Sequence, residues 1–162
     1  MKELKAERVR EILDYFPETG EFRWKVRSGS VKAGDVAGTP HSRGYIQIMV
    51  DGYIYLSHRL AWLYVYGYFP EAHIDHINCV KNDNRIANLR EANYSENGQN
   101  IRKPRRSNKL GFLGVYLHNC GKFVAQIQVN GKNKNLGYFS TPGEAHAAYL
   151  GAKRSLHQFG TL

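Results

Sequence analysis

The spacing of hydrophobic residues changes from a helical to a strand-like period near the N-terminus. From Lys2 to Phe16 the apolar residues gather on one side of a helical wheel, which predicts an amphipathic helix that ends at the Pro17–Gly20 turn. The next segment alternates around Phe22 and Trp24, as a half-buried strand does. The chain therefore opens with a helix followed by short strands.

A β-hairpin is the clearest element of the first half. Two alternating segments, Tyr45–Val50 and Tyr53–Leu56, flank Asp51-Gly52, and this dipeptide accepts the positive φ angles of a type I′ turn. The glycines and serines between residues 28 and 44 predict loops between short strands.

A short helix is expected after the hairpin. Ser57 is a candidate N-cap for a helix from His58 to Tyr66, and Gly67 and Pro70 are typical of the residues that end one.

The C-terminal third has a different order of elements. Residues 112–139 predict three strands, with Asn130-Gly131 as a second type I′ hairpin signal. Thr141, Pro142 and Glu144 then have the spacing of a helix start with a capping box. The apolar stripe of this helix is Ala145, Ala148, Tyr149, Ala152 and Leu156. The C-terminal order is therefore βββα.

Composition narrows the class of protein. The chain has 162 residues, of which 42% are hydrophobic, so it can bury a modest core. No apolar run approaches the roughly 18–20 residues of a membrane span, and the N-terminus lacks the apolar region of a signal peptide, so we expect a cytoplasmic protein. Cys79 and Cys120 are isolated, so we expect neither a disulfide framework nor a structural zinc.

The formal charge of +9 is concentrated in one part of the chain. No acidic residue lies between Glu96 and Glu144, and this interval holds eight basic ones: Arg102, Lys103, Arg105, Arg106, Lys109, Lys122, Lys132 and Lys134. A patch of one sign attracts a polyanion and gains from counterion release, although the same lysines also suit a solvated face.

The candidate chemistry lies between His73 and Asn100. Asp75 offers an anionic oxygen ligand for a hard divalent ion. A helix capped by Asn93 and Glu96 offers an amide oxygen from Asn97, the first choice of second ligand, or from Asn100 on the same face. His76 is suited to act as a general base because its unperturbed pKa lies near neutral pH.

Several neighbouring side chains have two readings. Asn88 is placed to hold the imidazole of the base, although asparagines also make turns. His73 suits packing or a substrate contact, and His58 suits bracing of the site. Arg59, Arg85 and Arg90 suit phosphate contacts or pairing with Glu71, Asp83 or Glu91.

The segment from Ser57 to Asn100 resembles the HNH endonucleases of the phage and homing type. The pattern D-H-I-N, followed by Asp83-Asn84-Arg85 and Asn88-Leu89-Arg90, carries this resemblance together with the upstream HRLAW. The resemblance implies that Asp75 and Asn97 bind the metal, that His76 is the general base and that Asn88 orients it. It also implies a product with a 5′-phosphate.

The C-terminal strands present a second candidate surface. In Lys122–Val129, alternate residues from Phe123 are apolar and face the expected helix, whereas Val124, Gln126 and Gln128 face away from it. Amides on a sheet can read base edges in the major groove while lysines hold phosphates. The expected DNA contacts are Arg102, Lys103, Arg105, Arg106, Lys122, Gln126, Gln128, Lys132 and Lys134.

Residues 111–159 are similar to the AP2 DNA-binding domain. The motif residues include Gly114-Val115, Asn130-Gly131-Lys132 and Leu136-Gly137-Tyr138-Phe139. The chain departs from the plant-type pattern at Phe123, Val124 and Gln126, where that pattern has a tryptophan and arginines.

These observations predict an α+β protein with three parts. They are an HNH endonuclease domain with a ββα-metal core and N-terminal β-hairpins (residues 1–100), a basic linker (101–110) and a small βββα AP2-like domain (111–162). The expected cofactor is a divalent metal, Mg²⁺ or Mn²⁺, and the expected partner is double-stranded DNA. No membrane or obligatory protein partner is expected, and a homodimer would permit double-strand breaks where a monomer nicks.

Two other functions fit parts of the same pattern. One is a non-catalytic AP2-type DNA-binding regulator that carries a remnant nuclease motif, and the other is an RNA-binding protein. Metal binding and cleavage separate the first from a nuclease, and competition by single-stranded RNA exposes the second.

Overall fold

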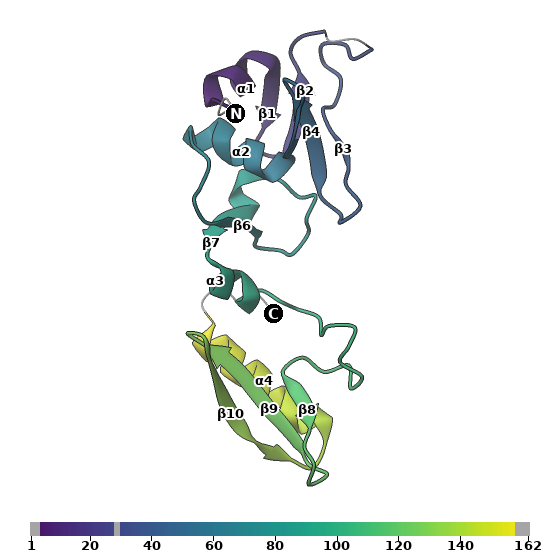
Figure 1. Cartoon of the computed structure of the whole chain (residues 1–162), viewed down its shortest axis with the longest axis vertical. Helices are drawn as coiled ribbons and strands as arrows, with labels where there is room; N and C mark the ends of the chain where they lie inside the picture. The colour runs from purple at the N-terminus through teal and green to yellow at the C-terminus, as the bar shows by residue number, and fades with distance from the viewer. Residues whose placement is uncertain (1–3, 28–29, 158–162) are drawn as a thin grey trace. The chain divides into compact units, whose positions relative to one another are not determined.

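The computed structural model describes residues 4–27 and 30–157, which form two compact units (Figure 1). The first unit is Met1–Ala92 and the second is Asn93–Leu162, so the division falls before the boundary after residue 100 that the sequence suggests. Each unit has its own hydrophobic core. Lys2, Ser28 and residues 158–162, which belong to segments predicted from the sequence, lie outside the described residues.

The N-terminal helix is shorter than its apolar pattern predicts. Helix α1 spans Ala6–Ile12, and Leu13–Phe16 forms strand β1, which pairs antiparallel with β2 (Glu21–Trp24). Strand geometry buries Leu13 and Tyr15 on one side and leaves Phe16 exposed. The prediction of helix up to Phe16 was wrong because this short apolar run fits both periods, and pairing with β2 decides between them.

The central hairpin has the predicted turn. Strands β4 (Ile46–Val50) and β5 (Tyr53–Leu56) are joined by Asp51 and Gly52, whose φ angles are 48° and 82°. The two-residue strand β3 (Thr39–Pro40) adds to the other edge of β4, in the order β3-β4-β5.

Helix α2 follows the hairpin directly and spans Ser57–Tyr66. Its N-cap is Leu56, and Ser57 is a buried residue of the first turn, so the expectation that Ser57 caps the helix was wrong. Gly67 ends the helix in the left-handed conformation, as expected. Leu60, Ala61 and Leu63 of α2 lie in the core of the first unit.

A two-stranded antiparallel sheet completes the first unit. Strand β6 (His73–His76) pairs with β7 (Leu89–Ala92), and the intervening residues 77–88, here called the motif loop, end in the short 3-10 helix η1 (Ile86–Asn88). The register places Asp75 opposite Arg90 and His76 opposite Leu89. This hairpin carries the candidate chemistry.

The second unit begins with helix α3 (Tyr94–Gln99). The predicted capping box is present, because the Asn93 side chain accepts from the Glu96 amide while the Glu96 side chain accepts from the Asn93 amide. A helix therefore follows the β6–β7 hairpin in the chain, in the predicted ββα order.

The C-terminal βββα order is confirmed. Strands β8 (Val115–Leu117), β9 (Phe123–Val129) and β10 (Lys132–Phe139) form one sheet with β9 in the centre. Helix α4 (Pro142–Leu156) begins at the predicted Thr141 capping box and lies along one face of this sheet (Figure 1).

The core of the second unit lies between this sheet and α4. Ala125, Ile127, Ala145 and Tyr149 meet there. Val124, expected to face solvent, is buried instead, since its cross-strand neighbours on that face, Tyr116 and Tyr138, are both large.

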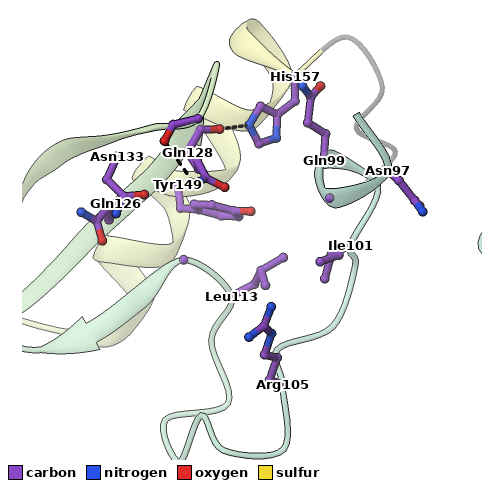
Figure 2. Close-up of a pocket in the computed structure, with 13 residues that line it drawn as sticks. Asn97, Gln99, Ile101, Arg105, Leu113, Gln126, Gln128, Asn133, Tyr149 and His157 are labelled. Atoms are coloured by element: carbon purple, nitrogen blue, oxygen red, sulfur yellow. Dashed lines mark hydrogen bonds between the residues drawn. The ribbon is translucent and has the colours of Figure 1, made fainter. Parts of the chain in front are cut away.

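The basic segment after α3 is tied to the C-terminal helix. The side chain of Lys153 is 2% exposed, and its Nζ donates to the Ile101 carbonyl oxygen at 2.7 Å. A pocket of about 650 Å³ lies in this unit (Figure 2). Its lining includes Asn97, Arg105, Gln126 and Gln128, with the Tyr149 ring beside them.

Two expectations from composition can be compared with the structure. Within residues 4–27 and 30–157, no helix combines the length and the apolar character that a membrane crossing needs. Cys79 and Cys120 are both exposed and form no disulfide with each other.

Candidate functional site

The two residues expected to carry the chemistry stand at the C-terminal end of β6. Asp75 is 7% exposed and His76 is 5% exposed. The strand ends at His76, and the motif loop then turns away, with Cys79 at a φ of 63°. The sequence-predicted pair is therefore placed side by side in the chain and shielded from bulk solvent.

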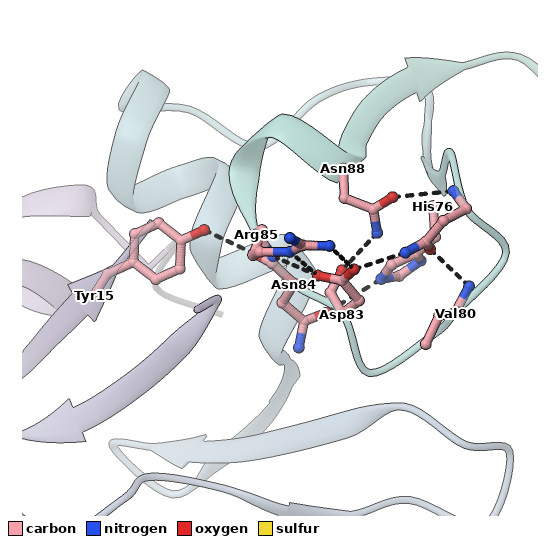
Figure 3. Close-up of polar contacts among 8 residues, drawn as sticks. Tyr15, His76, Val80, Asp83, Asn84, Arg85 and Asn88 are labelled. Carbon is pink, nitrogen blue, oxygen red and sulfur yellow. Dashed lines mark hydrogen bonds and ion pairs between the residues drawn. The ribbon is translucent and has the colours of Figure 1, made fainter. Parts of the chain in front are cut away.

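The imidazole of His76 contacts an asparagine of the motif loop (Figure 3). His76 Nε2 and Asn84 Oδ1 lie 3.2 Å apart, and Asn84 is 2% exposed. The carboxamide of Asn88, expected to hold this ring, accepts from the Asn78 amide at 3.0 Å and donates to the Asp83 carbonyl at 2.8 Å. Asn88 thus braces the loop, and its catalytic role stays a prediction.

Hydrogen bonds and an ion pair between residues of the motif loop stabilise its conformation. The Asn78 side chain donates to Asp83 and accepts from the Val80 amide. Arg85 pairs with Asp83, with Nη2 and Oδ2 2.6 Å apart, as one of the two readings predicted. Hydrogen bonding from Arg85 lowers the pKa of Asp83 to about 2, so this carboxylate is ionised at neutral pH.

Two aromatic rings enclose His76 from α2 and from the chain before β4. The ring centroid of His58 lies 5.0 Å from that of His76, at an edge-on angle of 77°, and that of Tyr45 lies 6.0 Å away. The Nδ1 atom of His58 is buried and has no hydrogen-bond partner. Burial lowers the pKa of His58 to about 3, so no positive charge stands at this position at neutral pH.

His76 itself is held neutral by its surroundings. Burial is the main cause that lowers the pKa of His76, while the hydrogen bond with Asn84 and the negative charge of Asp75 oppose the shift. A neutral imidazole has one nitrogen lone pair available for a proton. The state needed for a general base is therefore populated at neutral pH.

Asp75 forms an ion pair across the hairpin. Its Oδ2 atom accepts from Arg90 Nη2 at 2.8 Å and from Arg90 Nε at 3.1 Å. The sequence offered Glu91 as the partner of Arg90, and the strand register selects Asp75 instead. The carboxylate is thus partly neutralised and held in one orientation.

The described residues offer few donors for a metal ion. Among them no group of three or more His, Cys, Asp or Glu side chains could hold one. Asn97, the second ligand expected from the sequence, lies on α3 of the second unit and is exposed. An aspartate carboxylate is a ligand that suits Mg²⁺, which keeps water and phosphate oxygens as its other ligands.

Three other candidates can now be placed. His73 is exposed at the start of β6, so the packing role weighed for it is not supported. Arg59 lies over the Phe69 ring, 5.2 Å from its centroid. His58 packs against His76, which is the bracing position expected for it.

Of the expected DNA contacts, Gln126 and Gln128 lie on β9, and the four basic residues from Arg102 to Arg106 lie on the segment after α3. Lys132 and Lys134 stand opposite Val129 and Ile127, on the other side of the sheet from these amides. Strand register places Asn133 opposite Gln128 and Asn135 opposite Gln126, so these four amides, here called the outer face, point to the same side of the sheet. Gln126, Gln128 and Arg105 also line the pocket. The others, at positions 102, 103, 106, 122, 132 and 134, do not line it.

Comparison with known proteins concerns the site around Asp75 and His76, and not the sheet of the second unit. Residues 55–99 match the model of the HNH endonuclease family. The HNH segment thus includes α2, the β6–β7 hairpin, the motif loop and α3. It covers 45 of the 162 residues, from 55 to 99 inclusive, and supports a nuclease, which is a hydrolase that acts on DNA. No curated protein and no solved structure was found to match the chain.

Two residues of the HNH segment gained a role only from the structure. Asn84 was visible in the sequence as part of the Asn84-Arg85 motif, with no contact assigned to it. Arg90 was visible in Asn88-Leu89-Arg90, but its partner depends on a strand register that the motif does not encode. Tyr45, beside His76, has no signal in its local sequence.

Proposed function

We propose that the chain is a metal-dependent DNA endonuclease in which His76 accepts a proton from the attacking water. The observation that supports this most is the position of His76 at the end of β6 inside the HNH segment, neutral, next to Asp75 and held by Asn84. General base catalysis of this kind contributes about 10²- to 10⁴-fold to the rate. The proposed chemistry requires that a DNA phosphate reach these two shielded side chains.

The metal would be held by Asp75 and Asn97. When bound, it would neutralise the negative charge that develops on the phosphate during hydrolysis. Arg90 holds the Asp75 carboxylate in one orientation through its two hydrogen bonds to Oδ2. HNH nucleases generally use a divalent metal, and the oxygen donors available here favour Mg²⁺ or Mn²⁺.

The second unit would supply affinity for DNA as an AP2-like module. Its outer face carries four amides that can pair with base edges, and the basic residues of positions 102–134 would contact phosphates. Within residues 97–143 no carboxylate opposes them. The pocket would join Arg105 and three of the same amides, Gln126, Gln128 and Asn133, in one contact surface.

Plasmid cleavage tests the enzymatic proposal. Supercoiled DNA should be nicked with Mg²⁺ or Mn²⁺ and left intact with EDTA, and His76→Ala should slow cleavage by about 10²-fold or more while DNA affinity stays within two-fold. His73→Ala is the matched control, because it removes an exposed histidine from the same strand. Equal loss of cleavage in both variants, or full cleavage by His76→Ala, would exclude His76 as the base.

One observation favours a second function, a DNA-binding regulator with a remnant nuclease motif. Asp75 is already paired with Arg90, so its carboxylate does not need a metal to be stable in the folded protein. Calorimetric titration with Mn²⁺ separates the two functions. A nuclease should bind Mn²⁺ and lose this binding in Asp75→Ala, whereas a remnant would bind DNA without binding Mn²⁺ or cutting.

A further inference from the structure

The contact between His76 and Asn84 constrains where the proton of the imidazole lies. A neutral imidazole carries one N–H and one lone pair, on different nitrogens. Asn84 presents its Oδ1 atom to His76 Nε2 at 3.2 Å, and an amide oxygen can only accept. The proton therefore belongs on Nε2, and the lone pair on Nδ1.

Asn84 can impose this choice because its own position is fixed from the side away from His76. Its carbonyl oxygen accepts from the Tyr15 hydroxyl of β1 at 2.7 Å, and this bond is buried. Gly20 approaches so closely that a Cβ atom there would lie 2.4 Å from the Arg85 nitrogen and 2.5 Å from the Asn84 carbonyl carbon. The β1–β2 hairpin thus holds the backbone that carries the Asn84 amide (Figure 3).

The hydrogen bonds of the Asn88 side chain go to other residues of the motif loop and not to the imidazole. Its carboxamide, at the end of the motif loop, accepts from the Asn78 amide near the start of the loop and donates to the Asp83 carbonyl in its middle. Asp83 directly precedes Asn84. Loss of Asn88 would therefore disturb His76 through the loop, whereas loss of Asn84 removes the hydrogen bond itself.

We propose that Asn84 is the positioning residue that holds His76 as the Nε2–H tautomer, through the contact between its Oδ1 atom and Nε2. The consequence for cleavage rests on the proposed function, whereas the tautomer does not, because it is a property of the folded chain. This role is distinct from catalysis by contact, since Asn84 acts through His76. Tyr15 and Gly20 in turn hold Asn84.

The tautomer can be measured without any nuclease activity. Long-range ¹H–¹⁵N correlation spectra of the ¹⁵N-labelled full chain at pH 8 should show His76 with a protonated Nε2 and an unprotonated Nδ1. His76→Gln assigns the signals. A protonated Nδ1 in the wild-type chain would overturn the proposal directly, and this result needs no variant to fold.

Variants then test whether Asn84 causes the preference. Asn84→Ala should give averaged shifts for the two nitrogens of His76, and Asn84→Asp, which keeps an acceptor of the same shape, should restore the Nε2–H form. Asn82→Ala, an exposed asparagine of the same loop, should leave the spectrum unchanged. A folded Asn84→Ala chain that retains a pure Nε2–H signal would exclude Asn84 as the group that holds it.

Cleavage kinetics connect the tautomer to function. Under saturating DNA, Asn84→Ala should lower the cleavage rate by about 10- to 100-fold, the range found for groups that orient a reactive histidine, with little change in DNA affinity. Partial recovery in Asn84→Asp is expected, and an unchanged rate in Asn84→Ala would refute the positioning role. If the wild-type chain does not cut DNA, the proposed function fails, and the spectra still decide the tautomer.

Discussion

The motif loop and the outer face of the sheet use the same kind of side chain in opposite ways. In the loop, Asn84 and Asn88 are buried, and their hydrogen bonds go to other groups of the first unit. On the sheet, Gln128 and Asn133 are exposed to solvent. Buried amides with satisfied hydrogen bonds define one geometry, as a reacting group requires, whereas exposed amides can adapt to a partner.

Two glycines, one packed against the motif loop and one on the sheet, differ in the same way. Substitution of the first is expected to have the largest effect on stability. Gly20 and Gly131 have φ angles of 75° and 76°, but an added Cβ meets the Asn84–Arg85 backbone at Gly20 and nothing within 4 Å at Gly131. Gly20→Ala should lower the free energy of unfolding by about 3 kcal/mol or more, from backbone strain and overpacking together. Gly131→Ala should cost only the strain, about 1 kcal/mol.

Tryptophan fluorescence can follow the unfolding of the first unit separately from that of the second. Trp24 and Trp62 both belong to the first unit, so tryptophan fluorescence during urea unfolding reports on that unit. Gly20→Ala should move this fluorescence transition to lower urea concentration. Gly131→Ala should leave the fluorescence transition in place and shift only the part of the far-ultraviolet circular dichroism transition that comes from the second unit. Equal shifts of the fluorescence transition in both variants would contradict the close packing at Gly20.

Removal of one amide from each region should have the next largest effect. Asn88→Ala leaves the half-buried Asn78 amide and Asp83 carbonyl without this partner, which should cost about 2 kcal/mol. Asn133→Ala on the exposed sheet should stay within about 0.5 kcal/mol. Urea unfolding by circular dichroism measures both. A cost in Asn133→Ala as large as in Asn88→Ala would mean that the outer face is also a structural network.

The buried His58, which packs against His76, predicts a loss of stability in acid. The pKa of His58 is about 3 in the folded chain and 6.5 is its ordinary value, so between these pH values the unfolded chain binds a proton that the folded chain excludes. The free energy of unfolding should therefore fall as the pH drops below about 6.5, by about 2 kcal/mol at pH 5 from this group alone.

His58→Phe isolates this contribution because it keeps an aromatic ring at the position and removes the titratable nitrogens. Urea unfolding of both chains at pH 7.5 and pH 5 should show a smaller loss in the variant. Groups that do not interact with His58 titrate alike in the two chains and cancel in the difference. If wild type and variant lose the same stability, His58 takes up its proton in the folded state.

The smallest effect is expected for single cations of the second unit. Arg105→Ala should weaken DNA binding a few-fold and reduce the slope of log affinity against log salt by about 0.9, the value for one phosphate contact on duplex DNA. Arg8→Ala is the control, because Arg8 is already paired with Asp51 and Glu11 in the first unit. Equal slopes for Arg105→Ala and the wild type would remove Arg105 from the proposed contacts.

Two turn dipeptides and one pair of helix-capping residues in the sequence correctly predicted the hairpins and the helix to which they belong. Asp51-Gly52 and Asn130-Gly131 specify hairpins through positive φ angles, and Thr141 with Glu144 specifies the start of α4, because each signal acts within a few residues. The Asp75-His76 pair and its place at a strand end followed from the motif in the same way.

Contacts that depend on strand register or on loop closure could not be predicted from the sequence. The apolar residues of Leu13–Phe16 fit a helix as well as a strand, and only pairing with β2 decides. Arg90 meets Asp75 because of the β6–β7 register. Asn84 meets His76 because the loop closes over eight positions, while the sequence offered Asn88 for the same hydrogen bond.

The buried Lys153 limits how far the basic segment after α3 can act as a flexible linker. Its ammonium group binds the Ile101 carbonyl, so the stretch from Ile101 onward starts from an anchored point on the body that contains α4. Extra residues inserted after Arg106 would enlarge a surface loop of that body. The two units meet in the chain at Ala92 and Asn93, inside the HNH segment, so a glycine-serine insertion there would lengthen the connection between β7 and α3.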